Sequence, residues 1–177
     1  MYFCIIKKII MKKILNKTIP IILCLVFINL SIDYFKSKSY IDNSSPNEEI
    51  IELKKDYLTN IYYLDAKING HELEFILDTG CSCISIPYTK FNYLYSIGVI
   101  DDNDLVGTSE LTDANGNTET TNMYNIKKLT IGDMVIRNVL CSVSNNSESL
   151  FLLGQNVLSS FSNVTIDYDE HLLILKK

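Results

Sequence analysis

The chain has 177 residues, of which 47% are hydrophobic, and this length leaves room for one domain of about 100 to 150 residues plus an appendage. Its net charge is −5 and Arg137 is its only arginine, which argues against a nucleic-acid-binding surface, because such a surface needs clustered lysines and arginines. The two histidines and five cysteines show no Cys-x-x-Cys or His-x-x-x-His spacing, so neither a metal site nor a cofactor is expected.

Residues 1–35 are predicted to attach the protein to a membrane. Several lysines precede the apolar run 19–32, which is the order of a basic region and a hydrophobic core in export signals. The run is short for a spanning helix of about 20 residues, so a cleaved signal peptide is the alternative. Because no Ala-x-Ala site follows the run, we expect an uncleaved anchor, with the N-terminus in the cytoplasm and the remainder outside.

Residues 36–56 are rich in Ser, Asn, Lys and Glu and are predicted to be a polar linker. The folded domain is expected over residues 57–177. It begins with two β-branched and aromatic segments, 61–68 and 71–77. They are joined by Asn69-Gly70, which favours a two-residue hairpin turn, since both turn residues must adopt positive φ.

The second strand of this hairpin leads into the turn Asp78-Thr79-Gly80. Burying an ionised carboxylate without partners is costly, so an aspartate at the end of an apolar strand indicates a special environment or a function. Gly80 allows the backbone to approach a ligand closely. After an apolar strand at 84–86, Pro87 and the apolar spacing up to Gly98 predict a short amphipathic helix.

Two Thr-rich strands are predicted within residues 106–126, around Asn115-Gly116. Their polar character is typical either of an ordinary hairpin or of a mobile flap that closes over substrate, in which Asn115 and Gly116 would contact the substrate. Further strands are expected at 129–131, at 134–143, at 150–153, and in a closing hairpin of residues 164–168 and 171–175. Strands at this spacing indicate an all-β barrel or sandwich.

Two segments, in this order, resemble motifs of the retropepsin-like (retroviral-type) aspartic proteases, in their single-lobe bacterial form. The first is Phe75-Ile76-Leu77-Asp78-Thr79-Gly80, followed by a strand, and the second is Leu152-Leu153-Gly154, followed by a short helix. The resemblance covers the chain from about residue 57 onward. It implies a closed all-β acid-protease barrel with one or two short helices, and it assigns the catalytic role to Asp78, with Thr79 and Gly80 in support.

Carboxylates hydrolyse peptide bonds in pairs, one protonated and the other ionised to draw a proton from the attacking water. The chain contains a single Asp-Thr-Gly, so one polypeptide cannot supply both. A homodimer can, because a two-fold axis would bring the Asp78 residues of two subunits together. We therefore expect an extracytoplasmic aspartic endopeptidase that acts on peptide or protein substrates. The alternatives are an inactive peptide-binding module of the same fold on the membrane surface and an unrelated β-domain with a structural Asp78.

Three residues depart from the family pattern. Cys81 replaces the usual Ala or Ser beside the cleft, and Cys81 and Ser82 are candidate substrate contacts. Ser82 and Gln155 stand where many retroviral members carry an Asp and an Arg that pair near the dimer interface, and here both residues are neutral. In an oxidising compartment Cys83 and Cys141 could form a disulfide, and buried reduced thiols are the alternative.

Overall fold

The structure is a computed structural model that describes residues 38–112, 116–145 and 150–177. The predicted membrane segment, residues 1–35, lies outside these ranges, and within them no helix is long and apolar enough to cross a membrane. The described chain is mostly β, as predicted, with two short helices and one 3-10 turn, η1 (Asp102–Asp104). The helices are α2 (Tyr88–Ser96) and α3 (Gln155–Leu158). The strands are β1 (Tyr40–Ile41), β2 (Glu48–Glu52), β3 (Lys54–Asp56), β4 (Ile61–Ile68), β5 (His71–Leu77), β6 (Ile84–Pro87), β7 (Leu105–Thr112), β8 (Thr118–Ile131), β9 (Met134–Ser144), β10 (Leu152–Leu153), β11 (Asn163–Asp167) and β12 (Leu172–Lys176).

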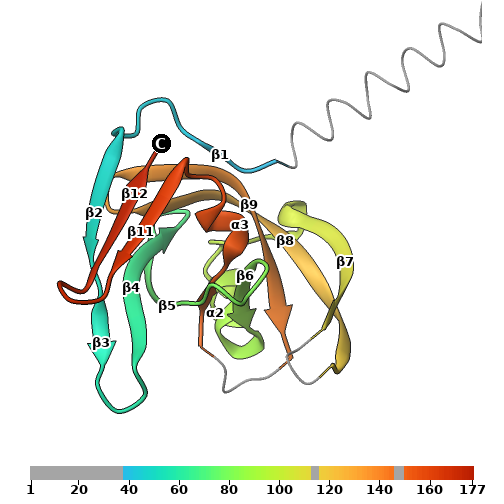
Figure 1. The fold of residues 1–177 in the computed structure, drawn as a ribbon. Coiled ribbons are helices and arrows are strands. Elements are labelled where there is room, and N and C mark those ends of the chain that lie inside the picture. The colour runs from blue at the N-terminus through green and yellow to red at the C-terminus, as the bar shows by residue number, and fades with distance from the viewer. Residues whose placement is uncertain (1–37, 113–115, 146–149) are drawn as a thin grey trace, which may run out of the picture. The chain divides into compact units, whose positions relative to one another are not determined.

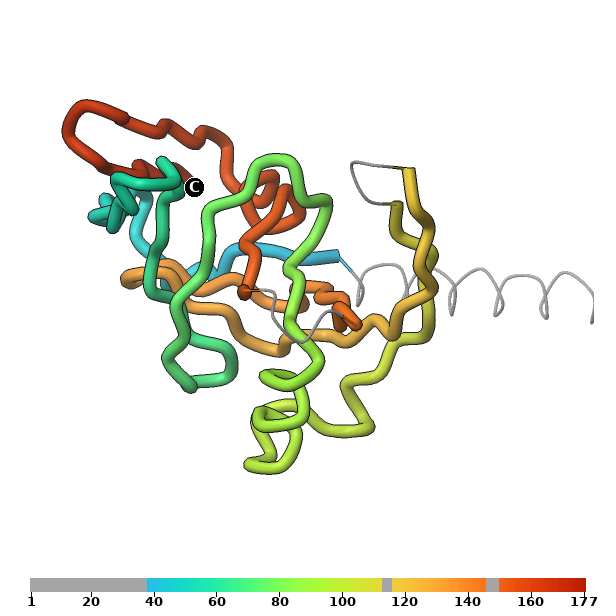
Figure 2. Tube along the Cα trace, turned by 90° about the horizontal axis from the view of Figure 1, so that it is seen from below, coloured from blue at the N-terminus to red at the C-terminus, as the bar shows by residue number. Residues whose placement is uncertain are grey.

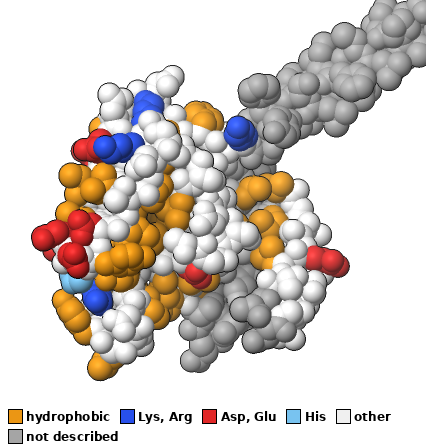
Figure 3. Space-filling view, in the orientation of Figure 1, with side chains coloured by type: hydrophobic (Ala, Val, Ile, Leu, Met, Phe, Trp, Pro, Cys, Tyr) orange, Lys and Arg blue, Asp and Glu red, His pale blue; other side chains and the backbone are white. Residues whose placement is uncertain are grey.

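Most of the strands belong to one large sheet (Figure 1), in the order β1-β9-β6-β10-β5-β4-β8-β7, with β3 alongside β4. Because β8 also pairs with β9, the hydrogen-bonded path that leaves β9 through β6 returns to β9 through β8. The strands β11, β12 and β2 form a second, antiparallel sheet. Apolar side chains are exposed on the face where this second sheet lies (Figure 3), and Ile50 of β2 is 56% exposed.

Residues 38–56, which were expected to belong to a polar linker, instead form part of the folded unit. β1 pairs with β9, β2 with β12 and β3 with β4. β2 has a mixed sequence, Glu-Glu-Ile-Ile-Glu, in which Ile51 packs against the core, and Leu53 just after it is only 3% exposed. The polar composition suggested a linker, but these strands are edge or surface strands, whose outward side chains are expected to be polar.

The first predicted hairpin is confirmed. β4 and β5 pair in antiparallel register, and the turn residues Asn69 and Gly70 have φ of 49° and 93°. The predicted helix after the Asp78 turn is also present as α2. Its end has the two hydrogen bonds of a Schellman motif, from Gly98 N to Tyr95 O and from Val99 N to Leu94 O, with Gly98 at φ +73°. The expected glycine cap is therefore confirmed.

The predicted hairpin after α2 is present as β7 and β8, which pair from Leu105↔Tyr124 to Thr112↔Thr118 and stand apart from the Asp78 turn in Figure 2. β8 differs from expectation, because it runs without a break to Ile131 and pairs along its second half with β9. The two adjacent lysines at its middle do not interrupt it, since Lys127 is exposed and forms an ion pair with the buried Asp104 at 2.8 Å.

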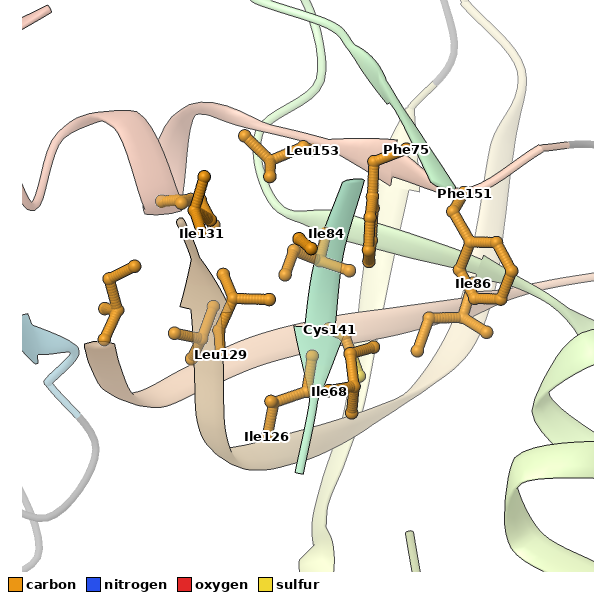
Figure 4. Packing of buried hydrophobic residues seen from close by; sticks show 14 of the residues in the cluster. Ile68, Phe75, Ile84, Ile86, Ile126, Leu129, Ile131, Cys141, Phe151 and Leu153 are labelled. Atoms are coloured by element: carbon orange, nitrogen blue, oxygen red, sulfur yellow. The ribbon is translucent and has the colours of Figure 1, made fainter. Parts of the chain in front are cut away.

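The main core includes side chains from the strands that enter and leave the Asp78 turn, together with side chains from β4, β8 and β9 (Figure 4). The rings of Phe75 on β5 and Phe151 just before β10 lie with their centroids 5.3 Å apart. Full burial of a side chain of this size contributes about 1.5–3 kcal/mol. The core members labelled in Figure 4 are Ile68, Phe75, Ile84, Ile86, Ile126, Leu129, Ile131, Cys141, Phe151 and Leu153. This packing fixes the strands that carry the turn.

Candidate active site

Asp78 follows directly after β5 and is held there by β10. β10 runs parallel to β5, with Leu152 opposite Ile76 and Leu153 opposite Leu77. The ladder continues into the turn, because the amide of Asp78 donates to the carbonyl of Leu153 at 3.1 Å. The aspartate is half-buried, whereas Thr79 and Gly80 are exposed. A strand of the large sheet thus places one carboxylate at the base of an open turn.

Local hydrogen bonds orient the carboxylate of Asp78. The Gly80 amide donates to Oδ1 at 2.8 Å, and the Cys81 amide donates to the Asp78 carbonyl at 3.3 Å. Gly80 lies close to the carboxylate, since a Cβ at this position would be 3.2 Å from Oδ1. An amide donor that bonds one oxygen of a carboxylate fixes its rotamer. The arrangement suits an acid whose other oxygen exchanges a proton with a water or with a second acid.

The Gly154 segment, the second motif of the sequence, is bonded directly to the Asp78 turn. The amides of Gln155 and Asn156, in the first turn of α3, donate to the carbonyls of Cys81 at 2.8 Å and Ser82 at 3.1 Å. Figure 2 shows the turn and α3 side by side. Gly154 must lack a side chain here, because a Cβ would lie 2.6 Å from the carbonyl oxygen of Cys81. The two motifs form one structural unit.

Gln155 has a role that the sequence did not reveal. Its side-chain Nε2 donates to the carbonyl of Thr79 at 2.9 Å, across 76 residues of sequence. The sequence analysis noted only that a neutral residue replaces the arginine of many retroviral members. The structure shows that this hydrogen bond ties the start of α3 to the backbone of Thr79, the residue that follows Asp78. A side-chain amide directly after the glycine that precedes a predicted helix is the signal that could have indicated such a contact.

Cys81 and Ser82 both lie on the turn. Ser82 is exposed, whereas Cys81 is partly buried and its thiol donates to the carbonyl of Cys83 at 3.0 Å. Burial raises the pKa of the Cys81 thiol, and the negative charge of Asp78 adds to this rise. The thiol therefore stays protonated at neutral pH and is a weak nucleophile.

The proposed disulfide is absent, because Cys81, Cys83 and Cys141 are all free thiols. Strand register gives the reason. Cys141 is opposite Ile84 in the β6–β9 pair and points with it into the core, where burial raises the pKa of its thiol far above the usual range. Cys83 is one residue earlier, on the other side of the pleat, where its sulfur contacts Ser142 Oγ at 3.6 Å. Of the two alternatives left open by the sequence, the structure therefore has the reduced thiols and not the Cys83–Cys141 bond.

The β7–β8 hairpin supplies the remaining candidate residues. Gly116, near its tip, is exposed with φ +85°, and Asn115 lies outside the described residues. A cavity of about 180 Å³ lies between this hairpin and strands β6 and β9. Its walls are Ser85, Leu111, Thr112, Asn117, Glu119, Thr121, Ser142 and Ser144. In the part of the chain that the structure describes, no group of three or more His, Cys, Asp or Glu side chains could hold a metal ion.

Comparison with known proteins agrees with this geometry. A family model described as "gag-polyprotein putative aspartyl protease" matches residues 64–160, more than half of the chain and a range that contains both motifs. The chain is also similar to the crystal structure of a retropepsin-like aspartic protease from Rickettsia conorii, with 25% identity, a TM-score of 0.53, and coverage of 78% of this chain and 92% of that one. No curated protein matches it. The chain, with its Asp78 turn fastened to the Gly154 segment, belongs to the retropepsin-like aspartic proteases.

Proposed function

We propose that the protein is an aspartic endopeptidase that works as a homodimer, with Asp78 of each subunit at one shared site. The observation that carries the proposal is the Asp78 turn, in which an oriented carboxylate stands beside an exposed Thr79 and Gly80. Family membership supports the same reaction. The single Asp-Thr-Gly of the sequence requires that the second carboxylate come from another copy of the chain.

In this proposal the two Asp78 side chains share one proton, because two like charges a few ångströms apart cannot both ionise. The ionised carboxylate takes a proton from a water that attacks the peptide carbonyl, while the protonated one donates to the carbonyl oxygen. When the tetrahedral intermediate collapses, the leaving nitrogen receives a proton and the C–N bond breaks. The Gly80 amide keeps each carboxylate in position through the cycle.

Dimerisation would use the exposed part of the turn. Thr79 lies at its surface, and Gln155 holds the Thr79 carbonyl from behind. This hydrogen bond would hold the backbone of Thr79 while its exposed side chain makes a contact across a two-fold axis. The β7–β8 hairpin of each subunit would cover the cleft as a flap.

The proposal also places the domain on the outer side of a membrane, anchored by residues 1–35. The apolar run 19–32 and the lysines that precede it support this part. Extraction of the full-length protein from membranes by detergent, but not by high salt or carbonate, is the expected behaviour. Release by salt alone would contradict an anchor.

The central test is cleavage of a mixed peptide pool by the full-length protein at several pH values. We expect Asp78→Asn to abolish all cleavage while it retains the circular dichroism of the native fold. Asp133→Asn is a matched control, because Asp133 is an exposed aspartate in the β8–β9 turn, and we expect it to cleave normally. Equal activity in Asp78→Asn would refute the catalytic role. A wild-type protein that binds peptides without cleaving them would instead favour the peptide-binding alternative.

Sedimentation and inactive-subunit mixing test the dimer. Adding an excess of Asp78→Asn subunits should lower wild-type activity in proportion to the mixed dimers formed, since each mixed dimer has only one carboxylate. If activity per wild-type subunit does not change, the site does not need two copies.

A further inference from the structure

Strand pairing brings side chains from two parts of the chain to the cavity beneath the β7–β8 hairpin. In the hairpin, Leu111 is opposite Glu119. On the other side of the cavity, Ser85 of β6 is opposite Ser142 of β9. Residues that are directly opposite in neighbouring strands share a face of the sheet, so each pair presents both of its side chains to the same space.

The residues that line this cavity are mostly polar and include one charged side chain, although apolar atoms form the larger part of its surface. Five of its residues carry a hydroxyl group, one is an amide, one is aliphatic, and Glu119 is the only ionisable residue. This composition differs from that of most ligand pockets, which are lined chiefly by apolar and aromatic side chains. The cavity therefore suits a side chain that has an aliphatic stem and a polar end.

Two hydroxyl groups on the wall are already committed to the protein. Thr121, which is 6% exposed, donates to the carbonyl of Val143, and Ser142, which is 2% exposed, donates to the carbonyl of Ile84 at 3.3 Å. These bonds hold the wall in one arrangement while each oxygen keeps a lone pair for another donor. The cavity is thus preformed and lined with hydrogen-bond acceptors.

The carboxylate of Glu119, in contrast, has capacity to spare. Its Oε1 accepts one long hydrogen bond, from the Asn145 amide at 3.4 Å. Among the described residues it takes part in no ion pair, whereas other acids on this domain, such as Asp104, are paired with lysine. A carboxylate has about four lone-pair sites, so most of its acceptor positions are open to a ligand.

The size and place of the cavity suit one substrate side chain. Its volume of about 180 Å³ is below the roughly 300–1,000 Å³ of pockets that hold a whole small-molecule ligand. Ser85 lies on the strand that leaves the Asp78 turn, and Cys83 of that turn contacts the wall residue Ser142 through its sulfur. The hairpin that carries Glu119 is the one that would cover a bound peptide.

We propose that this cavity is a specificity subsite in which Glu119 selects a lysine or arginine side chain of the substrate. The proposal rests on the proposed peptide-cleaving function for its substrate class. An ammonium or guanidinium group would bind the carboxylate of Glu119 and donate its other N–H groups to the hydroxyl oxygens of the wall. A homodimer has two such cavities, so the preferred substrates carry a basic side chain on both sides of the cut.

The test separates binding from cleavage by using full-length Asp78→Asn protein and fluorescent peptides that differ at one position at a time, with Lys, Gln or Glu. At one position on each side of the centre, we expect Lys to bind about fivefold more tightly than Gln, the upper range for a solvent-accessible ion pair, and Glu to bind more weakly than both. The Lys preference should shrink as salt is raised.

In the Asp78→Asn background, the further change Glu119→Gln should make the Lys and Gln peptides bind equally tightly. Glu119→Lys should reverse the order, so that the Glu peptide binds most tightly. Glu110→Gln is the matched control, because Glu110 is opposite Thr120 in the same hairpin and projects from the other face. It should leave the preference unchanged. A Lys preference that persists in Glu119→Gln, or no preference in the starting protein, overturns the subsite. If the Lys preference depends on Glu119 but the wild-type protein cleaves no peptide, the result supports the subsite and refutes only the proposed hydrolysis.

Discussion

Replacing Gly154 by alanine tests whether the Asp78 turn and α3 form one unit. The φ and ψ of Gly154, −100° and −173°, are open to alanine, so backbone strain does not contribute. The new Cβ, however, would lie 2.6 Å from the Cys81 carbonyl oxygen and 2.8 Å from the carbonyl carbon of Cys83. The contact atoms are backbone on both sides, so neither can move aside alone.

The expected cost has two parts. Inserting a methyl group into a filled site costs about 1–3 kcal/mol. If the turn and α3 separate to make room, the hydrogen bonds from Gln155 N and Asn156 N to the turn weaken, at about 0.5–1.5 kcal/mol each. The free energy of unfolding should therefore fall by about 2–6 kcal/mol in total. For a protein of this size that corresponds to a decrease in Tm of about 5–20 °C.

The assay is urea and thermal unfolding followed by circular dichroism, at one fixed protein concentration because assembly raises apparent stability. Gly116→Ala serves as the control. Its φ of +85° disfavours alanine by about 1–2 kcal/mol, but no atom lies within 4 Å of the added Cβ. A Gly154→Ala protein that loses less than Gly116→Ala would refute the reasoning. Peptide cleavage should also fall in Gly154→Ala, since the turn that holds Asp78 must shift.

Two further predictions concern hydrogen bonds seen in the structure. Gln155→Glu keeps the shape of the side chain but removes the donor to the Thr79 carbonyl. We therefore expect the free energy of unfolding, measured by urea titration, to fall by about 1 kcal/mol, and the rate of peptide cleavage to fall as well. Wild-type values for both measurements would contradict a structural role for this hydrogen bond. The Ser44 amide and hydroxyl and the Arg137 guanidinium lower the pKa of Asp42 from 3.8 to about 2, so Asp42 stabilises the fold above about pH 4 and this contribution is lost as the pH falls toward 2. Asp42→Asn should flatten the acid side of the stability profile, and an unchanged slope would count against it.

The local features of this fold could be predicted from the sequence because their causes are local. Asn69-Gly70 forms the expected turn since few other residue pairs tolerate two consecutive positive φ values. Gly98 ends α2 for the same reason. The apolar strand before Asp78 is β5, and the apolar residues before Gly154 form β10. That these two strands lie in parallel, side by side, was not predicted and is seen only in the structure.

The errors came from features that depend on distant partners. β2 and β3 have polar sequences, and they are strands because β12 and β4 offer them paired edges. Cys83 and Cys141, for which the sequence left a disulfide open, lie on opposite faces of neighbouring strands, and a one-residue difference in register decides this. The hydroxyl-lined cavity likewise could not be predicted, because its wall residues come from four separate strands and the hairpin loop.

By itself, the sequence determined the chemical groups of the turn: a single Asp-Thr-Gly with one acid and a glycine two residues later, from which we propose a homodimer. Only the tertiary structure decided how that turn is held and what surrounds it. It shows the hydrogen bond from Gln155 to the Thr79 carbonyl, the close approach of Gly154 to the Cys81 carbonyl, and the position of Glu119 in the cavity wall. The physical reason is that turn conformation depends on neighbouring residues, whereas the face on which a side chain emerges depends on the register between strands far apart in the chain.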